Sequence, residues 1–551
     1  MSTPTLTRVR MAYARIEAAD RPEVWIDLRP QQEVESEARS IDARVAAGEQ
    51  LPLAGQLFAA KGNIDVQGLP TTAGCPAYAY TPEADAPVVA RLRAAGAIAL
   101  GTTNLDQFAT GLVGTRSPYG AVRGAYDPQR ISGGSSAGSA VAVALGLVDF
   151  ALGTDTAGSG RVPAAFNGIV GIKPTRGLVP TTGVVPACAS LDCVTVFART
   201  LPEAERALSY MASPSARELP PLPQRAPGPW RVAVAALSQL GELDDGWGEA
   251  YEAAVARLRD AGAELRTLDL TPFTEAAAML YEGAFVAERY TAVGDFVDKL
   301  IAEGGAGLDP TVAGIITRAR DIPAHRLFAD QDRLAALRTR ALAELGDADA
   351  LMLPTAPGHP TLAEVAADPL GTNARLGRFT NSTNLFDLAA VAVPAGEVAG
   401  LPFGVMLIGP AFTDERLARI AALLQPRLRV AVVGAHLSGQ PLNPQLLALG
   451  ATLDRTTTTA PVYRLHALPT VPPKPGLVHV GEGGAAIEAE VWRLPAEGLG
   501  RLLAALPRPM ALGQVELADG SSVPGFLCEP AALPDAPDIT THGGWRAYLI
   551  R

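Results

Sequence analysis

Two serines and one lysine carry the chemistry that this sequence suggests. Ser135 and Ser159 lie 24 positions apart in the Gly/Ser-rich stretch GGSSAGSAVAVALGLVDFALGTDTAGSGR, and Lys61 lies upstream in FAAKGNID. The first histidine of the chain is His325. A serine hydroxyl is a weak nucleophile that needs an adjacent base. A serine hydrolase built from this stretch must therefore use a lysine where an imidazole is common.

A lysine serves as a base only when it is uncharged. Its pKa is about 10.4 in water, and burial disfavours the charged form and lowers that pKa by several units. A second hydroxyl can bridge the amine and the attacking hydroxyl. We therefore expect Ser159 to be the nucleophile, Ser135 the proton bridge and Lys61 the base. Lys61 follows the apolar residues LFAA, which predicts an inward-pointing strand end; the alternative is a solvated surface lysine.

The segment Thr156-Ala157-Gly158-Ser159 is the expected oxyanion loop. Its small residues let consecutive backbone N–H groups converge on the negative charge that develops during acyl transfer. Loss of one such donor typically costs about 3–4 kcal/mol of transition-state stabilisation. Asp155 and Asp192 are expected to hold the neighbouring loops and to tune Lys61.

Lys61, Ser135 and Ser159, in this order and within these glycine motifs, resemble the amidase signature family. The resemblance covers about residues 20–425. It implies amide hydrolysis by the Ser-Ser-Lys set and a cis peptide bond before Ser135. The commoner family form has glycine where this chain has Ala157, which leaves the backbone N–H free.

Two other interpretations of the glycine motifs stay open at this point. Gly/Ser stretches are often linkers, although apolar AVAVALGL within this one favours packed core. GSSAG also fits the G-x-S-x-G elbow of α/β-hydrolases. That pattern would make Ser136 the nucleophile and would need a downstream histidine, for which His325 and His359 are the first available residues.

Tyr281 and Arg289, in LYEGAFVAERY, are candidates for substrate binding. They are eight positions apart, so both can face the same side of one helix. A guanidinium matches a carboxylate bidentately, and a tyrosine hydroxyl can add a third hydrogen bond. The pair predicts a small anionic substrate; the alternative is a solvated surface pair. Arg161 is either a second anion anchor or a residue that holds the loop after Ser159.

LYEGAFVAERY together with the later segments VVGAHLSG and GGWRAYL resembles the allophanate hydrolase family over nearly the full length. The resemblance implies allophanate as substrate, N-carboxycarbamate as product, a C-terminal domain that assists its decarboxylation, and a functional link to urea carboxylase or to cyanuric acid breakdown. VVGAHLSGQPLN resembles, more loosely, the gamma-glutamylcyclotransferase-like fold. His436 is the expected base of that domain, His542 is the alternative, and Glu497 is a candidate acid.

Two further hypotheses compete with an allophanate-specific enzyme. One is a broad-specificity amidase, or a glutaminase-type protein that supplies ammonia to a partner. The other assigns the C-terminal domain to docking or dimerisation alone. The glutaminase-type hypothesis predicts a stable heteromeric partner, whereas for the allophanate-specific enzyme we expect a homodimer.

The composition is typical of a globular enzyme: 48% of the 551 residues are hydrophobic, 19% are charged, and the net charge is −11. This charge disfavours nucleic acid and anionic membranes as partners. The segment Ala140–Leu152 is too short to span a membrane and is expected to form a buried helix. Four scattered cysteines predict reduced thiols and a cytoplasmic protein. We expect no cofactor and no metal, because the sequence shows neither a metal site nor a nucleotide loop. GIVGIKPT is not a phosphate-binding loop, since it lacks the G-K-[ST] ending.

Helices and strands are expected to alternate up to about residue 425. Ala86–Ala95 and Tyr251–Ala261 have helical spacing. The first precedes the apolar strand Ala97–Leu100, and the second precedes the strand Glu264–Leu268. We predict an α/β fold, an α/β/α sandwich with a mixed central sheet over residues 1–427, in which Ser213–Pro229 forms a surface loop. Short strands with glycine turns then predict a small β-rich α+β domain over residues 428–551.

Overall fold

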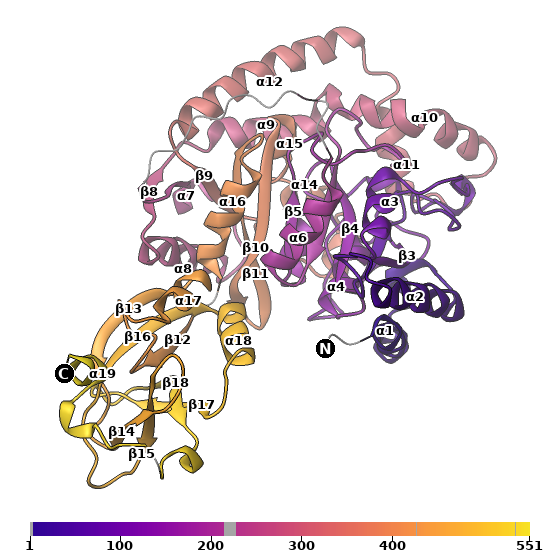
Figure 1. Cartoon of the computed structure of the whole chain (residues 1–551). Helices are drawn as coiled ribbons and strands as arrows, with labels where there is room; N and C mark the ends of the chain where they lie inside the picture. Colours follow the sequence, from indigo (N-terminus) through magenta and orange to yellow (C-terminus); the bar gives the residue numbers. More distant parts are fainter. Residues whose placement is uncertain (1–3, 214–216, 218–227, 426, 535, 551) are drawn as a thin grey trace. The chain divides into compact units, whose positions relative to one another are not determined.

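The computed structural model describes residues 4–213, 217, 228–425, 427–534 and 536–550, apart from the side chain of Glu497. The chain forms two compact units, Met1–Leu424 and Gln425–Arg551 (Figure 1). Each unit has a hydrophobic core of its own. The predicted loop Ser213–Pro229 falls largely outside the described residues.

A mixed sheet forms the centre of the first unit. Within the described residues it has eleven strands, of which β2–β3, β2–β4, β7–β8 and β7–β9 pair in parallel and the other neighbours are antiparallel. In spatial order the strands are β1 (Trp25–Leu28), β3 (Ile98–Thr103), β2 (Leu57–Lys61), β4 (Phe150–Asp155), β6 (Cys193–Ala198), β5 (Val170–Lys173), β10 (Leu388–Val398), β11 (Leu401–Pro410), β9 (Ala350–Pro354), β7 (Arg231–Val234) and β8 (Glu264–Thr267).

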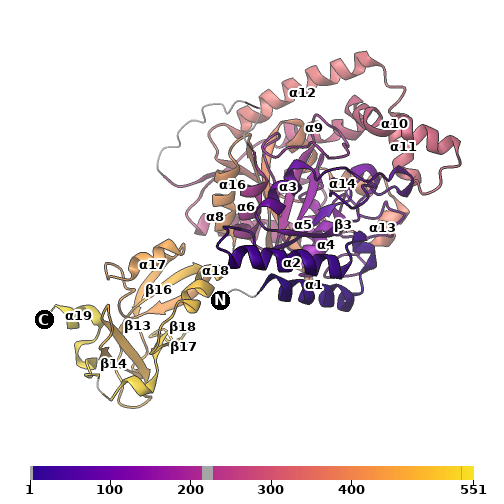
Figure 2. The same ribbon diagram turned by 45° about the vertical axis from the view of Figure 1, so that its right-hand side comes forward.

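Helices flank this sheet, which confirms the predicted fold class. Figure 2 shows α1 and α2 side by side, while α10, α11 and α12 gather at one end of the strands in both views. The helices are α1 (Thr5–Ala19), α2 (Gln31–Ala46), α3 (Pro87–Ala94), α4 (Ala137–Ala144), α5 (Val162–Phe166), α6 (Leu201–Met211), α7 (Leu237–Leu240), α8 (Trp247–Asp260), α9 (Thr271–Glu282), α10 (Ala287–Ala302), α11 (Pro310–Arg318), α12 (Ala324–Leu345), α13 (Leu362–Ala367), α14 (Gly371–Leu376), α15 (Asn381–Leu385) and α16 (Asp414–Ala421).

One predicted element is wrong. The apolar segment from Ala140 to Leu152 is not a single helix, because α4 ends at Ala144 and β4 begins at Phe150. Gly146 adopts a positive φ of 68° just after the helix, a conformation that favours glycine and ends helices. Asp149 then pairs with Arg8 at 2.6 Å. The stretch is therefore a helix, a turn and a strand.

The second unit is a small β-rich domain, as the sequence predicts. Its main sheet has the order β13-β16-β12-β18-β17, and β14 and β15 form a separate ribbon. No helix among the described residues of either unit has the length and apolar character that crossing a membrane requires. The elements are β12 (Arg427–Val432), α17 (Asn443–Ala448), β13 (Thr452–Thr458), β14 (Tyr463–Leu468), β15 (Lys474–His479), β16 (Glu488–Pro495), α18 (Ala496–Ala504), β17 (Met510–Glu516), β18 (Ser522–Cys528) and α19 (Trp545–Leu549).

Candidate functional site

Lys61 ends the buried strand β2 and points into the protein, as its apolar neighbours predict. Its side chain is fully buried. The Nζ atom lies 2.7 Å from Ser135 Oγ and 2.7 Å from Thr154 Oγ1. Burial lowers the pKa of Lys61 to about 7, although the carboxylates of Asp106, Asp192 and Asp155 act in the opposite direction. An uncharged amine is therefore accessible at neutral pH, next to a serine hydroxyl.

Ser135 lies in a loop that leaves no room for a side chain at the preceding residue. The Gly134–Ser135 peptide bond is cis, as the family resemblance implies. A Cβ atom added to Gly134 would lie 2.1 Å from Asp106 Oδ2 and 2.6 Å from the backbone nitrogen of Gly114. The buried Asp106 carboxylate accepts backbone N–H bonds from the loop that follows it, at Val113, Gly114 and Arg116.

Ser159 lies on the loop after β4, and only 2% of the residue is exposed. Its hydroxyl donates to the carbonyl oxygen of Gly111 at 3.5 Å. Among the described residues, no hydrogen bond joins Ser159 Oγ to Ser135 Oγ. The structure therefore brings Lys61 and Ser135 into direct contact and places Ser159 in the same buried region. The hydrogen bond between the two serine hydroxyls, which would complete a proton path from Ser159 to Lys61, is absent among the described residues.

The loop before Ser159 has free backbone donors. Within the part of the chain that the structure describes, the N–H groups of Ala157, Gly158 and Ser159 have no protein acceptor. Gly158 has a φ of 145°, and a Cβ atom there would lie 2.4 Å from Thr380 Oγ1. Position 158 thus needs glycine, while position 157 accommodates alanine. Three successive free N–H groups at one turn can bind a developing oxyanion.

Arg161 holds this loop in place. Its Nε and Nη2 atoms pair with the buried carboxylate of Asp155 at 3.0 and 2.9 Å. The remaining donors bind the carbonyl oxygen of Thr380, Thr383 Oγ1 and Asn384 Oδ1. Because all five donors are used within the protein, the structure supports loop fixation for Arg161 and contradicts the alternative of a second anion anchor.

Asp155 and Asp192 fix the loops around Lys61, as the sequence predicts. Asp155 also accepts the backbone N–H of Gly160 at 2.9 Å. Asp192 accepts the hydroxyl of Thr156 and, at 2.9 Å, the backbone N–H of Ala187. Both carboxylates therefore act on the site by positioning its loops and by their charge.

Tyr281 and Arg289 meet, but not on one helix. The chain breaks at Gly283 between α9, which carries Tyr281, and α10, which carries Arg289. The prediction of a shared helix face is wrong because Gly283 has an extended backbone with φ −92° and ψ −174°, and the carboxylate of Asp330 accepts the N–H of Ala284. Even so, Arg289 Nη2 donates to Tyr281 Oη at 3.1 Å.

The guanidinium of Arg289 is buried without an acidic partner. The residue is 1% exposed, and no carboxylate among the described residues lies within ion-pair distance of it. Its Nη1 donates to Thr110 Oγ1 at 2.9 Å, and its Nε has no partner in that part of the chain. A buried charge that lacks a counterion is costly. This cation is therefore suited to hold an anionic ligand.

The guanidinium of Arg289 and the hydroxyl of Ser159 contact two consecutive residues. Arg289 binds Thr110, and Ser159 binds the next residue, Gly111. The positive charge and the hydroxyl therefore contact one short backbone segment. A small molecule with an anion at one end and an amide at the other can reach both.

The histidine-dependent alternative is wrong. Ser136 precedes α4, and its hydroxyl exchanges hydrogen bonds with the backbone carbonyl and N–H of Thr154, at 3.0 and 3.2 Å. His359 stacks on Phe166 and bonds to the carbonyl oxygen of Ile131 instead. His325 is exposed at the start of α12. Neither histidine contacts Ser136.

Sequence reasoning missed three residues of this site. Thr154, Asp106 and Thr110 contact Lys61, the Ser135 loop and Arg289, respectively. The signal for Thr154 was a polar residue inside the apolar strand β4. Asp106 and Thr110 follow the apolar strand β3 in NLDQFAT, where polar residues at a strand end are candidates for a site.

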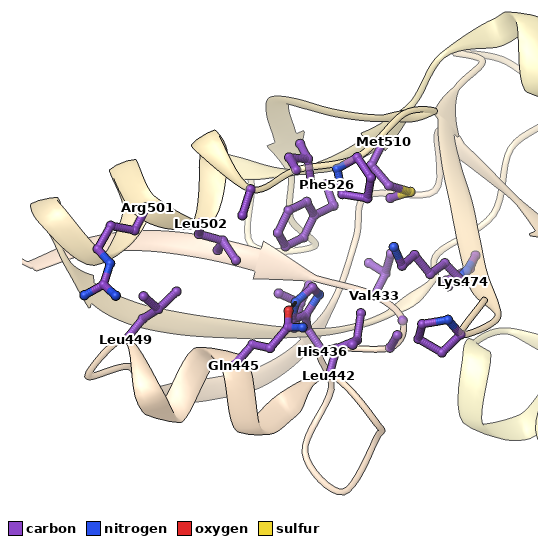
Figure 3. A pocket seen from close by; sticks show the side chains of 18 of the residues that line it. Val433, His436, Leu442, Gln445, Leu449, Lys474, Arg501, Leu502, Met510 and Phe526 are labelled. Atoms are coloured by element: carbon purple, nitrogen blue, oxygen red, sulfur yellow. Dashed lines mark hydrogen bonds between the residues drawn. The ribbon is translucent and has the colours of Figure 1, made fainter. Parts of the chain in front are cut away.

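The second unit contains a separate cavity around His436. This residue follows β12, and its ring stacks on Phe526 with centroids 5.1 Å apart (Figure 3). Its Nε2 lies 3.3 Å from Gln445 Oε1. Burial is the main cause that lowers the pKa of His436 below its usual value, so the ring is neutral at pH 7. The cavity it lines has a volume of about 520 Å³.

The other residues expected in this unit do not join His436. His542 packs against Tyr548 instead of lining the cavity. The side chain of Glu497 lies outside the described residues. A buried acid that the sequence did not single out is Glu490, which pairs with Arg546 at 2.6 Å and accepts the N–H of Ser438 at 2.8 Å.

Comparisons with known proteins place both units. Residues 8–418 match the family Amidase, and residues 428–550 match the allophanate hydrolase C-terminal domain. The chain is 42% identical to a urea amidolyase of Lachancea kluyveri, over 97% of this chain and 31% of that protein. It thus spans about a third of the length of the curated urea amidolyases that it matches.

Two further relatives are matched over most of their own length. A solved allophanate hydrolase of Kluyveromyces lactis is 40% identical with a TM-score of 0.71, covering 100% of this chain and 97% of that one. A glutamyl-tRNA(Gln) amidotransferase component of Symbiobacterium thermophilum is 36% identical, over 70% of this chain and 85% of that protein. The chain therefore belongs to the amidase family, as an amidohydrolase with an amidase domain followed by an allophanate hydrolase C-terminal domain.

Proposed function

We propose that this enzyme hydrolyses allophanate with Ser159 as nucleophile, Ser135 as proton bridge and Lys61 as base. The observation that carries the proposal is the buried contact of 2.7 Å between Lys61 Nζ and Ser135 Oγ, together with a lysine pKa of about 7. A base that is half-deprotonated at neutral pH is matched to general acid–base catalysis.

The reaction begins when Ser159 Oγ attacks the carboxamide carbon. The hydroxyl proton of Ser159 passes to Ser135 while the proton of Ser135 passes to Lys61 Nζ. The backbone N–H groups of the Ala157–Ser159 turn stabilise the oxyanion. This requires the two serine hydroxyls to approach on substrate binding, and catalytic hydrogen bonds are often long in the unliganded state.

The second half of the cycle reverses the proton path. The C–N bond breaks as Lys61, through Ser135, returns its proton to the leaving nitrogen, which departs as ammonia. A water molecule then gives up a proton to the same relay and attacks the ester carbonyl. The ester bond to Ser159 breaks as the relay returns that proton to Ser159 Oγ, and N-carboxycarbamate is released.

The anionic end of the substrate binds the buried cation. In this proposal the carboxylate of allophanate accepts hydrogen bonds from the Arg289 guanidinium and the Tyr281 hydroxyl. Arg289 lacks an acidic partner among the described residues, and the substrate supplies that charge. Charge-assisted hydrogen bonds of this type are roughly twice as strong as neutral ones.

The C-terminal domain would act on the released product. N-carboxycarbamate takes up a proton and loses one carbon dioxide to give carbamate, which takes up a second proton and breaks down to a second ammonia and a second carbon dioxide. His436 is the proposed base there, and its neutral ring and its place in a cavity support that role. The gamma-glutamylcyclotransferase-like fold of this domain and homodimerisation remain predictions.

The domain boundary is proposed at residues 427 and 428. The compact units meet at Leu424 and Gln425, and the C-terminal family match begins at residue 428. Because the matched urea amidolyases are about three times as long as this chain, we propose that a urea carboxylase activity supplies its allophanate.

The main competitor is an ammonia-supplying glutaminase role, favoured by the similarity to glutamyl-tRNA(Gln) amidotransferases. One assay separates the two: ammonia release from allophanate, malonamate, glutamine and propionamide by wild type and by Arg289→Ala. We expect the variant to raise KM for allophanate and malonamate about 100-fold, because it removes charge-assisted hydrogen bonds, and to change turnover of propionamide little.

Ser159→Ala is the blank for this assay and should release no ammonia above background. Glutamine as the preferred substrate of the wild type would refute the proposal in favour of the competitor. Equal losses on allophanate and propionamide would remove the anion-binding role of Arg289.

A further inference from the structure

The cavity of the second unit is far larger and more apolar than the proposed product requires. N-carboxycarbamate is a small dianion, whereas the cavity measures about 520 Å³, within the range of about 300–1,000 Å³ typical of sites for larger ligands. Most of its wall is aliphatic or aromatic, from β12, α17, α18, β17, β18 and the turns next to them. The apolar side chains include Val433, Leu442, Leu449, Leu502, Met510 and Phe526.

The polar side chains of the wall are few, and the charged ones among them are positive. They are His436, Gln445, Lys474 and Arg501, and the lining contains no carboxylate. Lys474 is half-buried at the start of β15, and neither it nor Arg501 makes an ion pair or a side-chain hydrogen bond to the described residues. Figure 3 shows Arg501 and Lys474 at opposite ends, with His436 and Phe526 between them.

We propose that this cavity binds a carboxylate with an aliphatic body, its carboxylate on Lys474 and its chain running along Leu502 and Phe526 toward Arg501. An unpaired, half-buried ammonium attracts a single anion. The apolar wall beyond it favours methylene groups over water. A small dianion would leave that wall in contact with water, and a neutral apolar ligand would leave Lys474 without a partner.

Isothermal titration calorimetry of the full-length protein with butyrate, hexanoate, octanoate and octanamide tests this site. Affinity should rise about fourfold for each added methylene group that is buried. Lys474→Met should weaken octanoate binding at least tenfold and octanamide binding less than twofold. Because Lys474 makes no side-chain hydrogen bond to the described residues, its replacement should leave the melting temperature unchanged.

Two further variants test whether octanoate binds in this cavity and not elsewhere on the protein. Ala505→Trp places a bulky group into the cavity from an exposed position on the helix end after α18 and should weaken octanoate at least tenfold. Lys299→Met, an exposed lysine on α10 in the first unit, is the matched control and should bind octanoate like the wild type.

Affinity that does not depend on chain length would overturn the inference, as would a Lys474→Met variant that keeps wild-type octanoate affinity. Malonate that binds more tightly than octanoate would also overturn it. That last result would leave the proposed step on N-carboxycarbamate intact, so the two ideas can fail separately.

Discussion

The two units differ in how deeply their polar side chains are buried and in how many hydrogen bonds hold them. In the first unit Lys61, Ser135 and Arg289 are each at most 1% exposed, and hydrogen bonds fix them from several strands and loops. In the second unit His436 makes one side-chain hydrogen bond in an apolar, partly open cavity. Moving protons between weakly acidic groups needs dry, fixed geometry, whereas holding an apolar ligand needs mainly shape and one charge.

The largest expected effect comes from removing the amine of the first site. Lys61→Met should lower kcat/KM for ammonia release about 10²–10⁴-fold, because general base catalysis is lost. In the wild type, kcat/KM should rise tenfold per pH unit below about pH 7 and level off above it, since only the neutral amine accepts a proton. Steady-state assays between pH 5 and 9 measure both quantities.

The same shift predicts a pH-dependent stability. The pKa of Lys61 is lower in the folded protein than in the unfolded chain, so the unfolded chain binds more protons between about pH 7 and pH 10.5. The contribution of Lys61 to stability therefore rises with pH across this window, and chemical denaturation of wild type and Lys61→Met at several pH values measures it.

A wild-type enzyme that is fully active at pH 5 would contradict the assignment of a neutral lysine.

A smaller effect contrasts the ion pairs of the two units. Arg161→Met leaves the fully buried Asp155 unpaired and should lower the free energy of unfolding of the first unit by about 3–5 kcal/mol. Arg546→Met should cost the second unit about 1–2 kcal/mol, because Glu490 keeps its bonds from Ser438 and Trp492.

Differential scanning calorimetry can resolve this contrast if each substitution shifts the transition of its own unit. Equal shifts for Arg161→Met and Arg546→Met would break the distinction between a fully buried ion pair and one whose arginine is partly exposed.

Local features of the chain were predictable from the sequence. The α/β fold, the inward Lys61 and the β-rich second unit follow from apolar runs and glycine turns that neighbouring residues encode. The helix break at Gly283 was not predictable, because it depends on Asp330, which is remote in sequence. The spacing of Tyr281 and Arg289 correctly indicated that the two side chains meet. The assumed geometry, one continuous helix, was wrong.

The other features that the sequence did not predict depend on contacts between residues that are far apart in the sequence. The sequence alone leaves two roles open for Arg161, because its partners near Thr380 come from a distant segment. Glu490 and Arg546 meet only in the folded second unit. In each case the residue type is visible in the sequence, but the partner that decides its role comes from tertiary packing.

The most direct test of the account is to locate the covalent intermediate. A fluorophosphonate or an activated acyl analogue should modify one residue of the wild-type enzyme, and peptide mass spectrometry should place the adduct on Ser159. The Lys61→Met variant should react far more slowly at that residue. An adduct on Ser135 or Ser136, or undiminished labelling without Lys61, would contradict the proposed relay.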